Sequence, residues 1–82
     1  RGRDLPEAMS MEKRSLSLAG HRTSLALEPE FWAVLDAAAA KQGRSLAGLV
    51  AEIDESRAAG GASGGLASAC RLWALRYVQA GQ

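Results

Sequence analysis

HRTSLALEPEFW, residues 21–32, is the stretch that decides the fold, because its hydrophobic period changes in the middle. In residues 21–27, Thr23, Leu25 and Leu27 share one face, and a period of two is typical of a half-buried strand. The second half opens with Glu-Pro-Glu at residues 28–30, where proline suits the first helical turn and acids suit its positive end. The sequence therefore predicts a strand followed directly by a helix.

The residues before this stretch alternate as well. RSLSL, residues 14–18, repeats the two-residue period, and Ala19-Gly20 between the two runs indicates a turn or a bulge. Residues 1–12 mix charges, a proline and small residues without a period, so we expect a mobile N-terminal arm.

Two further helices follow the first one. Gly43 is placed to end the first helix as a left-handed cap, and Ser45 is placed to cap a second helix that runs to about Arg57. The second helix carries one apolar stripe at helical spacing, formed by Leu46, Leu49, Val50 and Ile53. Residues 13–57 are therefore expected to form the core of the domain.

The C-terminal part is predicted to be a third helix behind a linker. Residues 58–65 contain four glycines and are expected to be flexible, and residues 66–82 follow as the C-terminal helix. This helix is apolar around most of its circumference, with Trp73 on its main stripe, so it needs cover from more than one side. We expect a second copy of the chain or a protein partner to supply that cover.

Composition narrows the class of protein. The 82 residues are 48% hydrophobic and 23% charged, which fits one small folded domain. The single cysteine and single histidine predict no disulfide and no zinc site. The chain shows no phosphate loop, GxGxxG or nucleophile elbow, so we expect neither an enzyme nor a cofactor. It shows no membrane span and no secretion signal, so we expect a cytoplasmic protein.

Charge is unevenly distributed along the chain. Residues 13–27 contain Lys13, Arg14 and Arg22 and no acid, whereas residues 28–55 contain six acids against two bases. A local basic stripe is found in nucleic-acid interfaces, but charge alone favours the second interpretation, a solvated face. In the second interpretation, Arg22 pairs with an acid such as Glu28.

The strand HRTSLAL, the helix start LEPEFW and the turn KQGRSL resemble the ribbon-helix-helix superfamily of Arc- and Met-repressor-like proteins. The longer stretch RSLSLAGHRTSLALEPEFW is similar to a largely uncharacterised bacterial branch of that superfamily. The resemblance implies a mostly α fold with a short β-ribbon, a ribbon-helix-helix homodimer with an extra C-terminal helix.

A lone strand has unpaired backbone groups on both edges, so we expect the same strand of a second copy to complete the ribbon. The upstream run, residues 14–18, offers an alternative in which it adds an outer strand to the ribbon. In that arrangement it would alter or block entry of the ribbon into a DNA groove. The residues expected in the dimer core are Leu25, Leu27, Trp32, Leu35, Leu49, Ile53 and Trp73.

In the family that the sequence resembles, the ribbon enters the major groove of double-stranded DNA. The implied base-facing residues are Arg22, Ser24 and Ala26, and the implied phosphate contacts are Lys13, Arg14, Arg44, Ser45 and Leu46. The resulting hypothesis is a DNA-binding transcriptional regulator. The alternatives are an antitoxin-like protein whose third helix docks on a partner, and a structural dimer with weak or no DNA binding.

Overall fold

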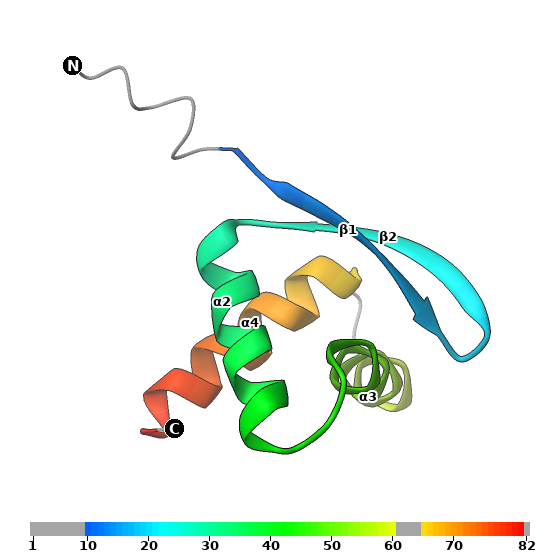
Figure 1. The fold of residues 1–82 in the computed structure, drawn as a ribbon. Coiled ribbons are helices and arrows are strands. Elements are labelled where there is room, and N and C mark those ends of the chain that lie inside the picture. The colour runs from blue at the N-terminus through cyan, green and yellow to red at the C-terminus, as the bar shows by residue number, and fades with distance from the viewer. Residues whose placement is uncertain (1–9, 61–64, 82) are drawn as a thin grey trace.

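The computed structural model describes residues 10–60 and 65–81, and in these residues a two-stranded hairpin lies over three helices (Figure 1). The elements in chain order are β1 (Glu12–Leu18), β2 (His21–Leu27), α2 (Pro29–Lys41), α3 (Leu46–Ala59) and α4 (Leu66–Gln79). The mostly α fold with a short β-ribbon and an extra C-terminal helix is therefore confirmed.

The two strands form an antiparallel hairpin whose register runs from Leu18 opposite His21 to Glu12 opposite Leu27. Ala19 and Gly20 connect them with φ angles of 53° and 87°. Two consecutive positive φ angles are typical of the two-residue turns whose twist matches that of a hairpin. The turn indicated by the sequence is therefore confirmed.

The expectation of a lone ribbon strand with two unpaired edges was wrong. β2 pairs along its whole length with β1 of the same chain. Two seven-residue strands joined by a two-residue turn close with little loss of chain entropy, so the nearest partner of β2 is the preceding run. One chain thus contains both strands of a ribbon.

The core lies between the hairpin and the helices. β1 packs against α3, and β2 packs against α4, so both strands are covered on one face. The largest fully buried side chains come from all three helices and from β2, and they are Trp32, Leu27, Leu35, Leu49, Val50 and Cys70. The core is therefore complete within a single chain.

The helix ends follow local signals in the sequence. Pro29 opens α2, Gly43 has a φ of 68° after its end, and Ser45 Oγ accepts a hydrogen bond of 3.0 Å from Gly48 N. α3 continues to Ala59, two residues beyond its predicted end. α4 begins at the predicted Leu66 and ends at Gln79. Residues 1–9 of the predicted arm and 61–64 of the predicted linker lie outside the described residues.

The outer side of α4 is uncovered in the single chain. Cys70 and Ala74 are buried beneath it, whereas Leu72, Leu75 and Val78 are 49%, 49% and 54% exposed. Among residues 10–60 and 65–81, no helix combines the length and the apolar character that crossing a membrane requires.

Candidate nucleic-acid interface

The hairpin turns one face toward the helices and the other away from them. On the face turned away, Lys13 pairs with Ala26, Ser15 with Ser24, and Ser17 with Arg22. Five of these six side chains are exposed, and Ala26 is half-buried. We call this surface the outer ribbon face, formed by Lys13, Ser15, Ser17, Arg22, Ser24 and Ala26.

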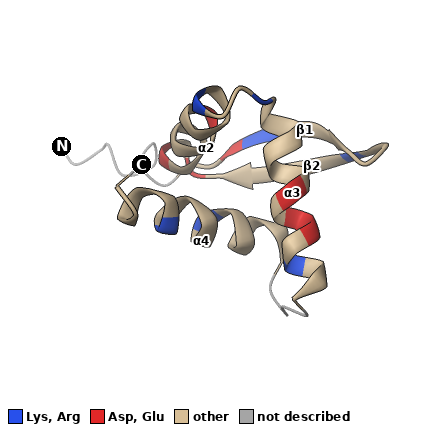
Figure 2. Ribbon diagram, turned by 90° about the horizontal axis from the view of Figure 1, so that it is seen from below, with Lys and Arg blue, Asp and Glu red and all other residues tan. Residues whose placement is uncertain are grey.

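The two cations of the outer ribbon face have no carboxylate partner. Within residues 10–60 and 65–81, neither Lys13 nor Arg22 forms an ion pair. Figure 2 shows blue, basic segments on both strands of the hairpin and red, acidic segments along α3. The side chains between the two cations are short, so the face is basic and nearly flat.

Arg14 lies on the opposite face of the hairpin, because it shares the parity of Leu16 and Leu18. Its guanidinium contacts Glu12 Oε2 at 2.8 Å and Asp36 Oδ1 at 3.1 Å. It also lies 4.5 Å from the ring centroid of Trp32. The structure thus separates Arg14 from Lys13, although the sequence placed both in one phosphate-binding set.

Arg44 is also engaged within the chain. It forms an ion pair with Glu52, and its guanidinium donates to Gly48 O at 3.0 Å. Beside it, Ser45 is exposed and Leu46 is half-buried at the start of α3. The first turn of α3 carries no acidic residue, and the first amide groups of a helix have no partner within it.

Glu28 is the acid that the sequence offered as a partner for Arg22, and it binds another arginine. Arg71 of α4 donates to both carboxylate oxygens of Glu28, at 2.8 and 3.1 Å. These hydrogen bonds lower the pKa of Glu28. The pair connects α4 to the junction of β2 and α2, and the pairing of Arg22 with Glu28 is not observed.

The residues predicted for a dimer core lie mainly inside one chain. Those buried here are Leu25, Leu27, Trp32, Leu35, Leu49 and Ile53. Trp73 is half-buried and stacks on Tyr77 with ring centroids 5.0 Å apart. Burial of these residues therefore does not by itself require a second copy.

Sequence reasoning missed Ser15 and Ser17 as members of the outer ribbon face. Their alternation with Leu16 and Leu18 was visible, but the run was not assigned to the ribbon. The same reasoning placed Cys70 on an apolar stripe, and it is buried, which raises the pKa of its thiol to about 11. Such a thiol is not an activated nucleophile. The described residues hold no cluster of three metal-ligating side chains.

Comparisons with known proteins point to one family. The model of a family described as the ribbon-helix-helix domain matches residues 11–78. Among solved structures, an uncharacterized protein from Bordetella pertussis Tohama I matches with 36% sequence identity and a TM-score of 0.72. The match covers 88% of this chain but only 58% of that protein. No curated protein matches.

Proposed function

Because the chain belongs to the ribbon-helix-helix family, we propose that it binds double-stranded DNA through the outer ribbon face and acts as a bacterial transcriptional regulator. The observation that carries this proposal is the difference between cations that pair with carboxylates and the two cations of the outer ribbon face. Among the described residues, four arginines are paired with carboxylates of the same chain, whereas Lys13 and Arg22 form no ion pair and both lie on a face without acids. Such a regulator would act in the cytoplasm, where bacterial DNA lies.

The width of the hairpin supports insertion of the ribbon of one chain. The major groove is about 12 Å wide and admits a two-stranded ribbon. Two strands lie about 4.8 Å apart, and β1 and β2 already form such a pair. If β2 also paired with β2 of a second copy, the outer strands would lie about 14 Å apart, which exceeds the groove. The inserted unit in this proposal is therefore one hairpin rather than a ribbon shared by two copies.

The side chains of the outer ribbon face define the expected contacts. Arg22, near the turn, can donate two hydrogen bonds to guanine or neutralise a phosphate. Ser24 can donate or accept, and Ala26 offers only a small apolar contact. Because the serines and the alanine are short, phosphate contacts should contribute more than base reading. The start of α3, where Ser45 is exposed and Leu46 is half-buried, is a second phosphate contact in this proposal.

The test is a titration of genomic DNA fragments at two salt concentrations. Lys13→Ala and Arg22→Ala remove one charge each from the outer ribbon face. Lys41→Ala is the matched control, because Lys41 is exposed and ends α2 far from the hairpin (Figure 1). If Arg22 contacts phosphate, binding weakens on all sequences and the salt slope falls by roughly one unit. If it reads guanine, the loss is about 1–3 kcal/mol and sequence preference relaxes.

The control fixes the interpretation of these variants. Lys41→Ala should leave both affinity and salt slope as in the unmodified chain. If folded Lys13→Ala and Arg22→Ala variants also retained both quantities, the outer ribbon face would have no role in DNA binding.

A second candidate function is an antitoxin-like or structural interaction dimer. The exposed apolar side of α4 is the observation that favours it, because Leu72, Leu75 and Val78 serve no purpose in the DNA-binding proposal.

A further inference from the structure

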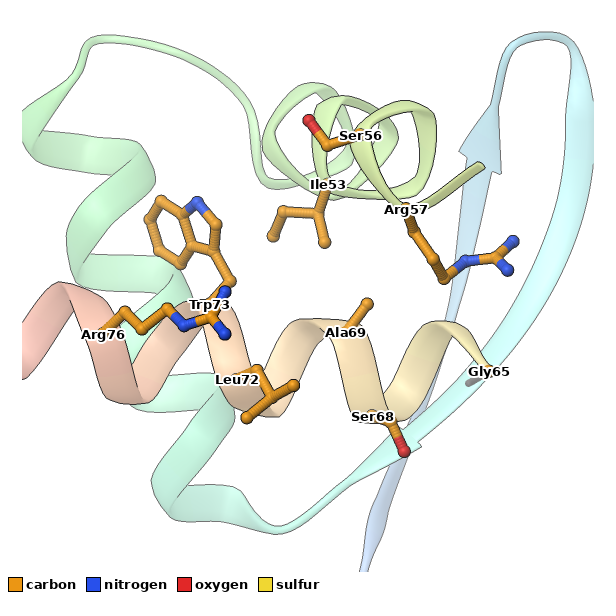
Figure 3. Close-up of a pocket in the computed structure, with 9 residues that line it drawn as sticks. All are labelled: Ile53, Ser56, Arg57, Gly65, Ser68, Ala69, Leu72, Trp73 and Arg76. Carbon is orange, nitrogen blue, oxygen red and sulfur yellow. The ribbon is translucent and has the colours of Figure 1, made fainter. Parts of the chain in front are cut away.

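A groove of about 340 Å³ lies between α3 and α4 (Figure 3). Ile53 points into it from α3, and Ala69 and Trp73 point toward α3 from α4. Because Ala69 is small, the two helices leave space between them at this point. Pockets that bind small molecules have volumes of about 300–1,000 Å³ and mainly apolar walls. The groove therefore has the size and the lining of a site for a small molecule.

The groove is bordered by cations and by no acid. Its lining residues include Arg57 and Arg76 but neither aspartate nor glutamate. Arg57 is bound to Asp54, whose Oδ1 lies 2.7 Å from Arg57 Nη2. Arg76 is exposed and forms no ion pair within residues 10–60 and 65–81. Arg76 is therefore the lining cation whose charge is available to a ligand.

The position of Arg76 places this charge beside the apolar walls. Leu72 and Arg76 are four residues apart, so they lie on one side of α4, and Figure 3 shows the guanidinium turned toward Leu72. The indole ring of Trp73 stacks on Tyr77 with ring centroids 5.0 Å apart, which fixes the wall next to it. A guanidinium group is a planar fork that binds a carboxylate through two parallel hydrogen bonds.

We propose that this groove binds a small organic acid, whose carboxylate pairs with Arg76 and whose aromatic or aliphatic body lies between Ile53 and Ala69. A carboxylate without an apolar body would bind weakly, because an exposed ion pair contributes little. A neutral apolar molecule would fill the groove but leave Arg76 without a partner. A molecule with both parts uses both features of the site. The site is separate from DNA binding, since none of its lining residues belongs to the outer ribbon face.

The extent of the groove favours a small molecule over a protein segment. A stable protein interface needs about 800 Å² of surface from each partner. On α3 the lining residues span only 53–57, which is little more than one helical turn. The volume also lies in the lower part of the range for ligand pockets, so it suits a molecule with one ring or a short chain.

The test is an NMR titration of the full chain with phenylbutyrate, which combines a phenyl ring, a short chain and a carboxylate. The chain has two tryptophans, and Trp73 is the one that lines the groove. The indole N–H signal of Trp73 should shift and saturate. The signal of Trp32, which donates to Glu12 O, should stay in place. Phenylbutanol has the same body without the charge, and it should bind about fivefold more weakly.

Two substitutions test the two parts of the site. Arg76→Gln removes the charge, so it should weaken phenylbutyrate binding about fivefold and leave phenylbutanol binding unchanged. Ala69→Leu fills the groove, so it should abolish binding of both compounds. Lys41→Gln and Ala37→Leu are the matched controls, because both residues are exposed on α2 and neither lines the groove. Both controls should bind phenylbutyrate as the unmodified chain does.

Three results would overturn the proposal. They are an unmoved Trp73 signal with phenylbutyrate, equal affinity for phenylbutanol, and full affinity in Arg76→Gln. A groove already covered by a second copy or by a protein segment would give the first of these. The titration contains no DNA, so failure of this site leaves the role of the outer ribbon face to the Arg22→Ala titration.

Discussion

Replacing Arg14 with alanine should destabilise the fold and leave DNA binding unchanged. The side chain connects β1 to α2, because its guanidinium lies 3.1 Å from Asp36 Oδ1 and 4.5 Å from the ring centroid of Trp32. The adjacent Trp32 Nε1 donates to Glu12 O at 2.7 Å, so this cluster holds the first strand of the ribbon in place. The sequence alone had assigned Arg14 to DNA phosphates.

The contacts set the expected magnitude. The side chains of Arg14 and Asp36 are 30% and 47% exposed, so their ion pair contributes only about 0.2–1 kcal/mol. A cation–π contact at such a site adds about 0.5–1 kcal/mol. We expect Arg14→Ala to lower the free energy of unfolding by about 1–2 kcal/mol. In a chain of this size that corresponds to a fall in melting temperature of roughly 5–15 °C.

Urea denaturation followed by tryptophan fluorescence measures this loss. A double-mutant cycle with Asp36→Ala isolates the ion pair from the contact with Trp32. DNA titration at a temperature where the variant is folded should give the affinity and salt slope of the unmodified chain. If Arg14→Ala kept full stability and lowered the salt slope, the inward placement of Arg14 would be refuted and its phosphate role reinstated.

Three further predictions concern the stability of the core, a helix cap and an ion pair. Leu49→Ala or Ile53→Ala should cost about 2–5 kcal/mol in urea denaturation, because both residues are buried, and a cost near zero would contradict the core. Ser45→Ala should cost about 1 kcal/mol by removing the cap of α3, while DNA binding weakens only modestly, since the backbone amides remain. Because Arg71 lowers the pKa of Glu28, this carboxylate stabilises the fold above the ordinary glutamate pKa of about 4.3, and that contribution disappears as the pH falls through the lowered value. The stability difference between the unmodified chain and Glu28→Gln should therefore be constant at neutral pH and shrink in acid.

Local patterns in the sequence predicted the elements well. The period of two located both strands, and Pro29, Gly43 and Ser45 marked helix ends that the structure confirms. Each of these signals depends on residues within one helical turn. The family resemblance, carried by residues 13–57, agrees with the match to the ribbon-helix-helix domain.

The pairing of strands was not predicted, because a two-residue period says which face is buried but not which strand lies alongside. The orientation of Arg14 could have been predicted, since it alternates in phase with Leu16 and Leu18 and so must share their buried face. The ion pair between Arg44 and Glu52 could not have been predicted, because it depends on how the two side chains lie over the first turns of α3. The candidate site therefore needed the three-dimensional structure to separate exposed cations from paired ones.

Because both strands of the ribbon belong to one chain, folding of the chain does not depend on association with a second copy. The hairpin, α3 and α4 cover the core without a second copy, and Leu72, Leu75 and Val78 on the outer side of α4 are only about half exposed. Leu75→Ser should therefore leave the urea midpoint at low protein concentration unchanged. If folding instead required a partner, the unfolding midpoint would rise strongly with protein concentration and Leu75→Ser would lower it. Denaturation at two protein concentrations, with and without the substitution, distinguishes these outcomes.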